Sequence, residues 1–338
     1  MMQTPNLFSY ATSELSQDAF ICWLLEWSDP KNKKSDIYLH QCGEELLKSF
    51  FLKSDIEYPK ELKQIEIFKQ FKNIDVLAIL NKEYAIIIED KTNTGNHSNQ
   101  LKRYLKIVER EGYNIKKIIP IYFKTYDQSN YKDVLDKNYN LFLRKDFLNI
   151  LNNYTEIKNN IFLEFKSHLQ SIEDRVNSFK KYPIEEWNWY SWIGFYKEIK
   201  SNMNTDYCDC DWAYVPNKGG GFLGLWWNFR EKDKYTLHLQ FEQEKLCFKI
   251  RVDDKEKRSH LRNLLSKEIC EISNEFDLSF NKPKRFGKGL HMTVAVLNED
   301  ARKVDENGEI NISETLKILD QCNDLMNKII INTTYKKI

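Results

Sequence analysis

Two neighbouring apolar segments place the strongest constraint on how this chain can fold. Residues 74–80 read IDVLAIL and residues 84–91 read YAIIIEDK, with the polar Asn-Lys-Glu of residues 81–83 between them. Two runs rich in β-branched residues, joined by a short polar loop, predict a β-hairpin. Charged residues occur inside the first run and at the end of the second, so their positions depend on how the two strands pair.

The length of the loop decides which residues face each other. If all three polar residues form the loop, Leu80 faces Tyr84, and counting back along the antiparallel pair places Asp75 opposite Glu89. A two-residue loop would shift the register by one residue and separate the two acids. Side chains that face each other have Cβ atoms about 4.5–5.5 Å apart, and like charges there are destabilising.

A divalent cation would relieve this repulsion. Period-2 alternation places Lys91 on the same face as Glu89, and Asp90 on the other face. The hairpin therefore predicts a metal site with an ammonium group beside it. The alternative is an ordinary strand end with solvated charges. That alternative does not explain why Asp75 lies inside an apolar run, where an unpaired carboxylate is costly.

The pattern resembles the PD-(D/E)xK nuclease superfamily, whose members carry an Asp on the second core strand and the motif E/D-x-K on the third. Asp75, Glu89 and Lys91 match these positions, although isoleucine precedes Asp75 where the motif has proline. Residues 100–104, QLKRY, resemble the QxxxY helix motif of the RecB-like branch. The i,i+4 spacing places Gln100 and Tyr104 on one helix face. The alternative is a solvated glutamine and a partly buried tyrosine.

The resemblance implies a catalytic metal centre. It assigns Mg²⁺ or Mn²⁺ to Asp75, Glu89 and the backbone carbonyl of Asp90, and hard cations prefer such oxygen ligands. By the same resemblance, Lys91 orients or helps to deprotonate the attacking water. Gln100 is then expected to position that water or the phosphate. Tyr104 is expected to pack, or to hydrogen-bond the nucleic-acid backbone.

A fourth acid comes from the first helix. Thr12-Ser13 is a helix N-cap signal, and Glu14 follows directly. In the family that this chain resembles, a Glu of the first helix often points at the metal. The helix macrodipole alone also favours a carboxylate in the first turn, so a structural role is an equal alternative. Asp18, one turn later, is the substitute candidate.

Composition limits the partners and the compartment. Lys and Arg number 51 against 50 Asp and Glu, and the net charge is +1, so a nucleic-acid surface has to be a local basic patch. No apolar segment is long enough to span a membrane, and the N-terminus lacks an export signal. Seven scattered cysteines fit a reducing compartment. We therefore expect a cytoplasmic protein without membrane contact, and the sequence leaves open a homodimer.

The order of elements predicts an α/β fold. The resemblance implies a restriction-endonuclease-like αβββαβ core with a mixed sheet in residues 1–155. Residues 156–182 are expected to form a linking helix, and residues 183–338 a C-terminal α+β domain of unknown role with an antiparallel meander. The expected helices of the core span about 13–28, 39–53 and 97–111, and its strands about 63–71, 74–80, 84–91 and 117–124.

The second half offers two further features. Lys284, Arg285 and Lys288 lie in the most concentrated basic loop of the chain, which predicts contact with nucleic-acid phosphates or simply a solvated loop. Residues 187–196, WNWYSWIGFY, are rich in aromatic side chains. Such side chains stack on unpaired bases or, more often, form core.

Three functional hypotheses follow. The first is a metal-dependent endonuclease or exonuclease that hydrolyses phosphodiester bonds, with DNA favoured over RNA, in defence or DNA processing. The second is a non-catalytic module on the same fold that binds nucleic acid or protein. The third, a metal-dependent hydrolase of a small phosphate ester, is the weakest because the chain has no nucleotide-binding loop.

Overall fold

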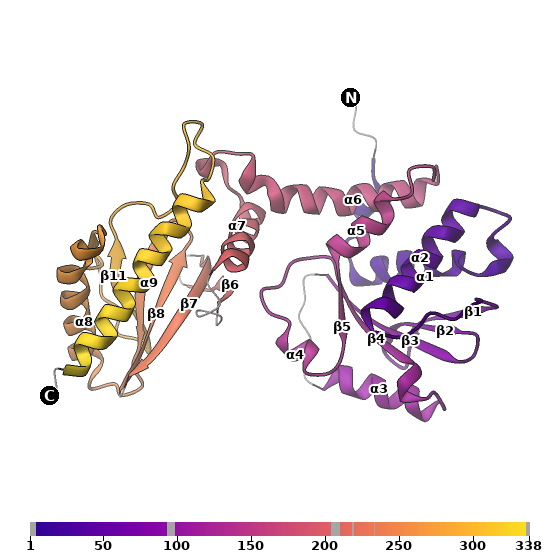
Figure 1. The fold of residues 1–338 in the computed structure, drawn as a ribbon, viewed down its shortest axis with the longest axis horizontal. Helices are drawn as coiled ribbons and strands as arrows, with labels where there is room; N and C mark the ends of the chain where they lie inside the picture. Colours follow the sequence, from indigo (N-terminus) through magenta and orange to yellow (C-terminus); the bar gives the residue numbers. More distant parts are fainter. Residues whose placement is uncertain (1–4, 93–98, 204–209, 218–219, 233, 336–338) are drawn as a thin grey trace. The chain divides into compact units, whose positions relative to one another are not determined.

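The chain forms two compact units (Figure 1). The computed structural model describes residues 5–92, 99–203, 210–217, 220–232 and 234–335. Unit 1 comprises Met1–Asp174 and unit 2 comprises Arg175–Ile338. Each unit has its own sheet and its own apolar core, as expected for a domain.

Unit 1 is built on a five-stranded sheet in the order β1-β2-β3-β4-β5. The first three strands are antiparallel, and β4 and β5 run parallel to β3. The expected mixed sheet of an α/β core is thereby confirmed. The strands are β1 (Ile65–Phe71), β2 (Ile74–Leu80), β3 (Tyr84–Lys91), β4 (Ile118–Lys124) and β5 (Asn140–Leu143).

The hairpin between β2 and β3 has the expected register. Leu80 pairs with Tyr84, so the loop contains three residues. Asn81 and Lys82 have φ values of 53° and 57°, and the backbone N–H of Glu83 donates to the carbonyl of Leu80 at 2.9 Å. Left-handed residues in such a loop match the right-handed twist of the flanking strands. The local turn chemistry therefore sets the register on which the predicted acid pair depends.

Helices cover both faces of this sheet. Alternate residues of β2 and β3 point to opposite faces, and one set packs in a core with α1, α2, α5 and α6 while the other packs with α3. Burial on both faces explains why these strands read as continuous apolar runs. The helices are α1 (Glu14–Trp27), α2 (Ile37–Lys53), α3 (Gln100–Arg110), α4 (Lys132–Leu135), α5 (Arg144–Asn152) and α6 (Asn160–Val176), with 3-10 turns at Leu7–Ser9, Pro30–Asn32 and Ile115–Lys117.

The elements of unit 1 follow the expected αβββαβ order, with small shifts at their ends. α3 begins at Gln100, whereas the expected helix began at residue 97, and residues 97 and 98 lie outside the described part of the chain.

Residues 156–182 were expected to link two domains. Phe165 and Leu169 of α6 pack in the core of unit 1, and the division between the units falls inside this helix. The proposed domain boundaries at 155 and 182 stay a prediction.

Unit 2 contains a six-stranded antiparallel sheet in the order β10-β11-β9-β8-β7-β6. Strands β6 to β9 form the expected meander. The strands are β6 (Asp211–Val215), β7 (Phe222–Lys232), β8 (Tyr235–Glu242), β9 (Lys245–Arg251), β10 (Phe280–Asn281) and β11 (His291–Leu297). The helices are α7 (Trp189–Asn202), α8 (Arg258–Ile272) and α9 (Ile312–Tyr335), with 3-10 turns at Asn177–Lys180, Ile184–Glu186 and Ser273–Phe276.

The aromatic residues of unit 2 are mainly core. Trp192, Tyr196 and Trp227 are buried in the cluster formed by the sheet and its helices, whereas Trp189 is 42% exposed. The interpretation of the aromatic segment at residues 187–196 as core therefore holds for most of its rings.

None of the helices in the described residues is both long and apolar enough to cross a lipid bilayer.

Candidate active site

The predicted acids of unit 1 converge on one ammonium group. Lys91 Nζ lies 2.6 Å from Glu89 Oε1, 3.6 Å from Asp75 Oδ2 and 3.8 Å from Glu14 Oε2. It also donates to the backbone carbonyl of Asp90 at 2.9 Å. The four groups assigned to a metal in the sequence analysis thus all surround the side chain of Lys91.

Backbone contacts hold two of these acids in place. The backbone N–H of Asp90 donates to Asp75 Oδ2 at 2.9 Å, across the end of the hairpin. The N–H of Thr92 donates to Glu14 Oε1 at 3.1 Å, which ties the start of α1 to the end of β3. Glu14 keeps its other oxygen, Oε2, on the side of Lys91. Asp75 uses Oδ2 toward both the Asp90 N–H and Lys91, and its Oδ1 accepts from Gln70.

Burial makes Glu89 a weaker acid than a solvated glutamate. Its side chain is 0% exposed, and its Oε2 accepts no hydrogen bond from the described residues. Burial, followed by the charge of Asp75, raises the pKa of Glu89 to about 7, although Lys91 opposes the rise. Burial alone would lower the pKa of Lys91, but the charges of Glu89, Asp75 and Glu14 outweigh it and raise that pKa. The lysine is therefore charged at neutral pH.

The donor set fits a hard divalent cation. Asp75, Glu89 and the Asp90 carbonyl offer only oxygen atoms, and Glu89 brings a buried oxygen without a donor. Within the described residues, no group of three or more His, Cys, Asp and Glu side chains is arranged to hold a metal ion. A cation here would thus depend on two carboxylates, a carbonyl and further oxygens from water or substrate. The ammonium of Lys91 lies among these oxygens and neutralises them.

A second acidic pair lies on the opposite face of the sheet. Asp18 and Asp90 interact electrostatically, because burial and then the charge of Asp18 raise the pKa of Asp90. Burial is the main cause that raises the pKa of Asp18 to about 6 and that of Asp90 well above its usual range. Gln17 donates to Asp90, and Gln70 donates to both Asp18 and Asp75 at 3.2 Å. Asp18 thus contacts the site through Gln70 instead of facing Lys91.

Gln100 and Tyr104 meet on α3, as their spacing predicts. Gln100 Nε2 donates to the Tyr104 hydroxyl at 2.7 Å. Burial raises the pKa of Tyr104, and the negative charges of Glu89 and Asp75 add to the rise, so the ring lies within electrostatic reach of both acids.

The sequence analysis missed a set of polar residues behind the site. Lys124 pairs with Lys91 across β3 and β4, is buried, and donates to the carbonyl of Thr92 at 2.7 Å. Burial lowers the pKa of Lys124 to about 8. Thr125 donates to Gln17 at 2.6 Å, and Arg144 donates to the carbonyl of Thr125 at 2.6 Å. The only signal in the sequence was a lysine that ends the apolar run IIPIYF.

The remaining candidates lie in unit 2. Lys284 and Arg285 are exposed and line a pocket of about 510 Å³ with Lys245 and Lys282. Lys288 is exposed as well but does not line this pocket. The structure therefore brings two of the three predicted loop residues to one concave surface.

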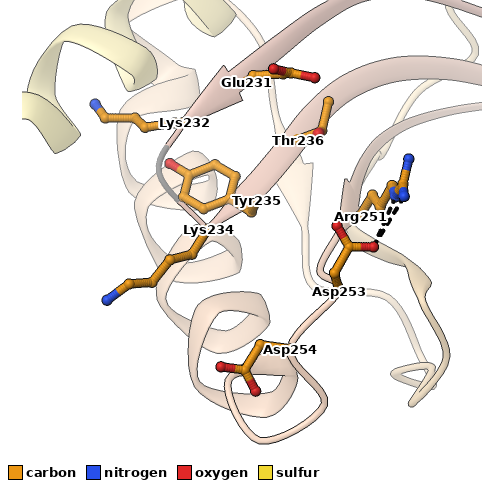
Figure 2. Close-up of a pocket in the computed structure, with 8 residues that line it drawn as sticks. All are labelled: Glu231, Lys232, Lys234, Tyr235, Thr236, Arg251, Asp253 and Asp254. Carbon is orange, nitrogen blue, oxygen red and sulfur yellow. Dashed lines mark hydrogen bonds and ion pairs between the residues drawn. The ribbon is translucent and has the colours of Figure 1, made fainter.

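A second pocket of unit 2 has balanced charges. Figure 2 shows this pocket of about 410 Å³ at the turn between β7 and β8, where an ion pair joins Arg251 and Asp253 at 3.0 Å. Three cationic and three acidic side chains line it, so it offers no net attraction to a polyanion. Its charged residues are Glu231, Lys232, Lys234, Arg251, Asp253 and Asp254.

Comparison with known proteins gave one match. The family model described as PD-(D/E)XK nuclease superfamily matches residues 5–182. This segment contains the whole Lys91 cluster and extends a few residues past the end of unit 1. No curated protein and no solved structure matches the chain.

Proposed function

Because the chain belongs to the PD-(D/E)XK nuclease superfamily, we propose that it is a metal-dependent nuclease that hydrolyses phosphodiester bonds, of DNA in preference to RNA. The convergence of Asp75, Glu89 and the Asp90 carbonyl on one point carries the proposal. A buried carboxylate and a partly buried one beside a lysine are costly to maintain in a protein that does not use them.

Each residue has a separate role in this proposal. Asp75, Glu89 and the Asp90 carbonyl would hold Mg²⁺ or Mn²⁺, with Glu14 as a further ligand. The bound cation would supply a more acidic water and would neutralise charge on the phosphate. Lys91 neutralises the acids when no cation is bound, and otherwise directs its ammonium to the attacking water or to a phosphate oxygen.

The residues of α3 act beside this centre. Gln100 positions the attacking water or the phosphate, and its hydrogen bond with Tyr104 keeps the amide oriented. Tyr104 is buried, and burial and the charges of Glu89 and Asp75 raise the pKa of its hydroxyl. In unit 2, Lys284, Arg285 and Lys288 would contact phosphates of the nucleic acid. A role in defence or DNA processing rests on analogy with the fold alone.

One observation favours a second candidate, a non-catalytic binding module. Lys91 lies 2.6 Å from Glu89 and neutralises the acids without any cation. A protein that had lost catalysis could keep this ion pair as a structural element. The two candidates differ in whether cleavage requires Lys91.

A cleavage assay on the full-length protein separates them. Single-stranded, duplex and branched DNA and RNA are incubated with Mg²⁺, Mn²⁺ or a chelator. We expect metal-dependent cleavage that Lys91→Ala slows by about 10²-fold or more, because it removes electrostatic help at the reacting phosphate. Lys33→Ala, which removes an exposed lysine of the same unit, is the control for contaminating nucleases. Equal single-turnover rates for Lys91→Ala and the unaltered protein would exclude catalysis at this site.

A further inference from the structure

One side of α3 carries an uncompensated stripe of positive charge. Leu101, Tyr104 and Val108 pack on the sheet, and the residues on the opposite side of the helix are exposed. A single acid, Glu109, lies among them. The exposed cations are Lys102, Arg103, Lys106 and Arg110, and we call these four residues the α3 stripe.

The spacing of the stripe is unfavourable for the isolated helix. Lys102, Lys106 and Arg110 follow one another at i,i+4, where like charges lower helix stability. None of the four cations has an ion pair recorded in the described residues. Other lysines of unit 1 are paired, such as Lys72 with Glu111 and Lys53 with Asp146. With a net charge of +1 for the chain, the stripe is a local excess and not part of a general basic surface.

The stripe lies on the same helix as two residues of the candidate active site, Gln100 and Tyr104. α3 begins with Gln100, whose amide donates to the Tyr104 hydroxyl at 2.7 Å. Arg103 lies over the Tyr104 ring, with its guanidinium carbon 5.3 Å from the ring centroid. Lys102, Arg103, Lys106 and Arg110 also line one pocket of about 390 Å³ together with Asn99 and Ile107. The same helix therefore carries site residues on one side and a concave basic surface on another.

We propose that the α3 stripe binds the sugar-phosphate backbone of the nucleic-acid substrate and delivers it to the acid cluster. From Lys102 to Arg110 the helix rises about 12 Å, which spans three to four nucleotides at about 3.4 Å of rise each. Exposed cations at this spacing can contact successive phosphates, and such contacts fix position without reading sequence. This inference rests on the proposed nuclease function.

The composition of the helix favours a polyanion over a lipid surface. Interfacial helices insert large apolar side chains beside their basic residues. No large apolar side chain of α3 is exposed, and Ile107 is only half-buried at the edge of the stripe. The stripe therefore offers charge without an apolar anchor, which suits a phosphate backbone.

Binding measurements on the full chain test the inference independently of cleavage. Fluorescence anisotropy with labelled duplex and single-stranded DNA is recorded in EDTA, and again with Ca²⁺, between about 50 and 200 mM salt. The variant is Lys102→Ala/Lys106→Ala/Arg110→Ala; Arg103 is kept because it contacts Tyr104. Alanine favours helix, so the variant should fold, and circular dichroism checks it. A second variant, Lys102→Arg/Lys106→Arg, keeps the charge and should bind like the unaltered protein.

The matched control variant replaces three other lysines of unit 1 by Ala and so removes the same amount of charge. Lys33, Lys34 and Lys60 are exposed, have no ion pair recorded in the described residues, and flank α2, which covers the other face of the sheet. A parallel arm replaces Lys284, Arg285 and Lys288 of unit 2 by Ala.

The α3 variant and its control variant should differ clearly in DNA affinity and in its salt dependence. We expect the slope of log affinity against log salt, which is negative, to become shallower in the α3 variant by about 3 for duplex and about 2 for single strands. Its Kd at about 0.1 M salt should rise by about 10²-fold or more, while that of the control changes little. Equal Kd and equal slope for the α3 variant and its control would overturn the inference and leave the nuclease proposal intact. If the unaltered protein bound neither duplex nor single-stranded DNA, this inference would fail, and so would the proposal that DNA is the substrate.

Discussion

The buried carboxylate of Glu89 makes a prediction that can be worked out from the structure. In metal-free protein, the pKa of this group lies near 7 in the folded state, against 4.5 when solvated, mainly because of burial. Between these pH values the folded state binds a proton that the unfolded state has released. Stability therefore falls as pH rises from about 4.5 to 7. At about 1.4 kcal/mol per pKa unit, the loss amounts to about 3 kcal/mol.

Glu89→Gln removes this titration and nearly preserves the shape of the side chain. In EDTA, the variant and the unaltered protein should have similar stability near pH 5, because Glu89 is then protonated. Near pH 8 the variant should be more stable by about 3 kcal/mol. Asp18 and Asp90 contribute a loss of the same sign, but they are present in both proteins and cancel in the difference.

Hydrogen exchange of the β2 and β3 amides measures the opening free energy of unit 1 without interference from unit 2. At pH 8, adding Mg²⁺ to about 100 times its Kd should stabilise the unaltered protein by about 2.7 kcal/mol and leave Glu89→Gln unchanged. Parallel pH profiles for the two proteins would refute the argument, since Glu89 would then be solvated or permanently ionised in the folded state.

Two further substitutions test the metal centre and the residues behind it. Asp75→Asn should abolish the rise in melting temperature caused by Mg²⁺, while metal-free stability changes by no more than about 1 kcal/mol, because relief of repulsion offsets one lost hydrogen bond. A large loss in EDTA would identify Asp75 as a structural acceptor instead. Arg144→Met should cost about 3 kcal/mol in urea unfolding, because the buried guanidinium pairs with Asp127 and Glu173, each at 2.8 Å. An unchanged midpoint would mean that these acids are satisfied by water.

The relation between the acids of the hairpin could be predicted from the sequence because it is local. Alternation along a strand and a three-residue loop are enough to place Asp75 and Glu89 on one face, and the observed register confirms that loop. The expected strands of unit 1 agree with the structure within two residues for the same reason, since their apolar runs end at turn residues. The meander of unit 2 also follows from regularly spaced turns.

Helices α7 and α9 of unit 2 were harder to predict. The aromatic segment that forms α7 has no clear helical or strand period, and α9, the longest helix, carries apolar residues at helical spacing that were not assigned. Their packing against the sheet, and not local propensity alone, defines these elements. The basic loop illustrates a related limit, because only two of its three predicted residues share a pocket.

The sequence by itself determined the acids, their spacing and their common face, because these depend on residues only a few positions apart. Only the tertiary structure showed that Glu14 and Gln17 of α1 reach the end of β3, that Asp18 accepts from Gln70 of β1, and that Lys91 is surrounded by oxygens. Those contacts join residues up to 78 positions apart. No periodic pattern encodes them, because they arise when packing of the apolar faces brings distant elements together and excludes water from the acids.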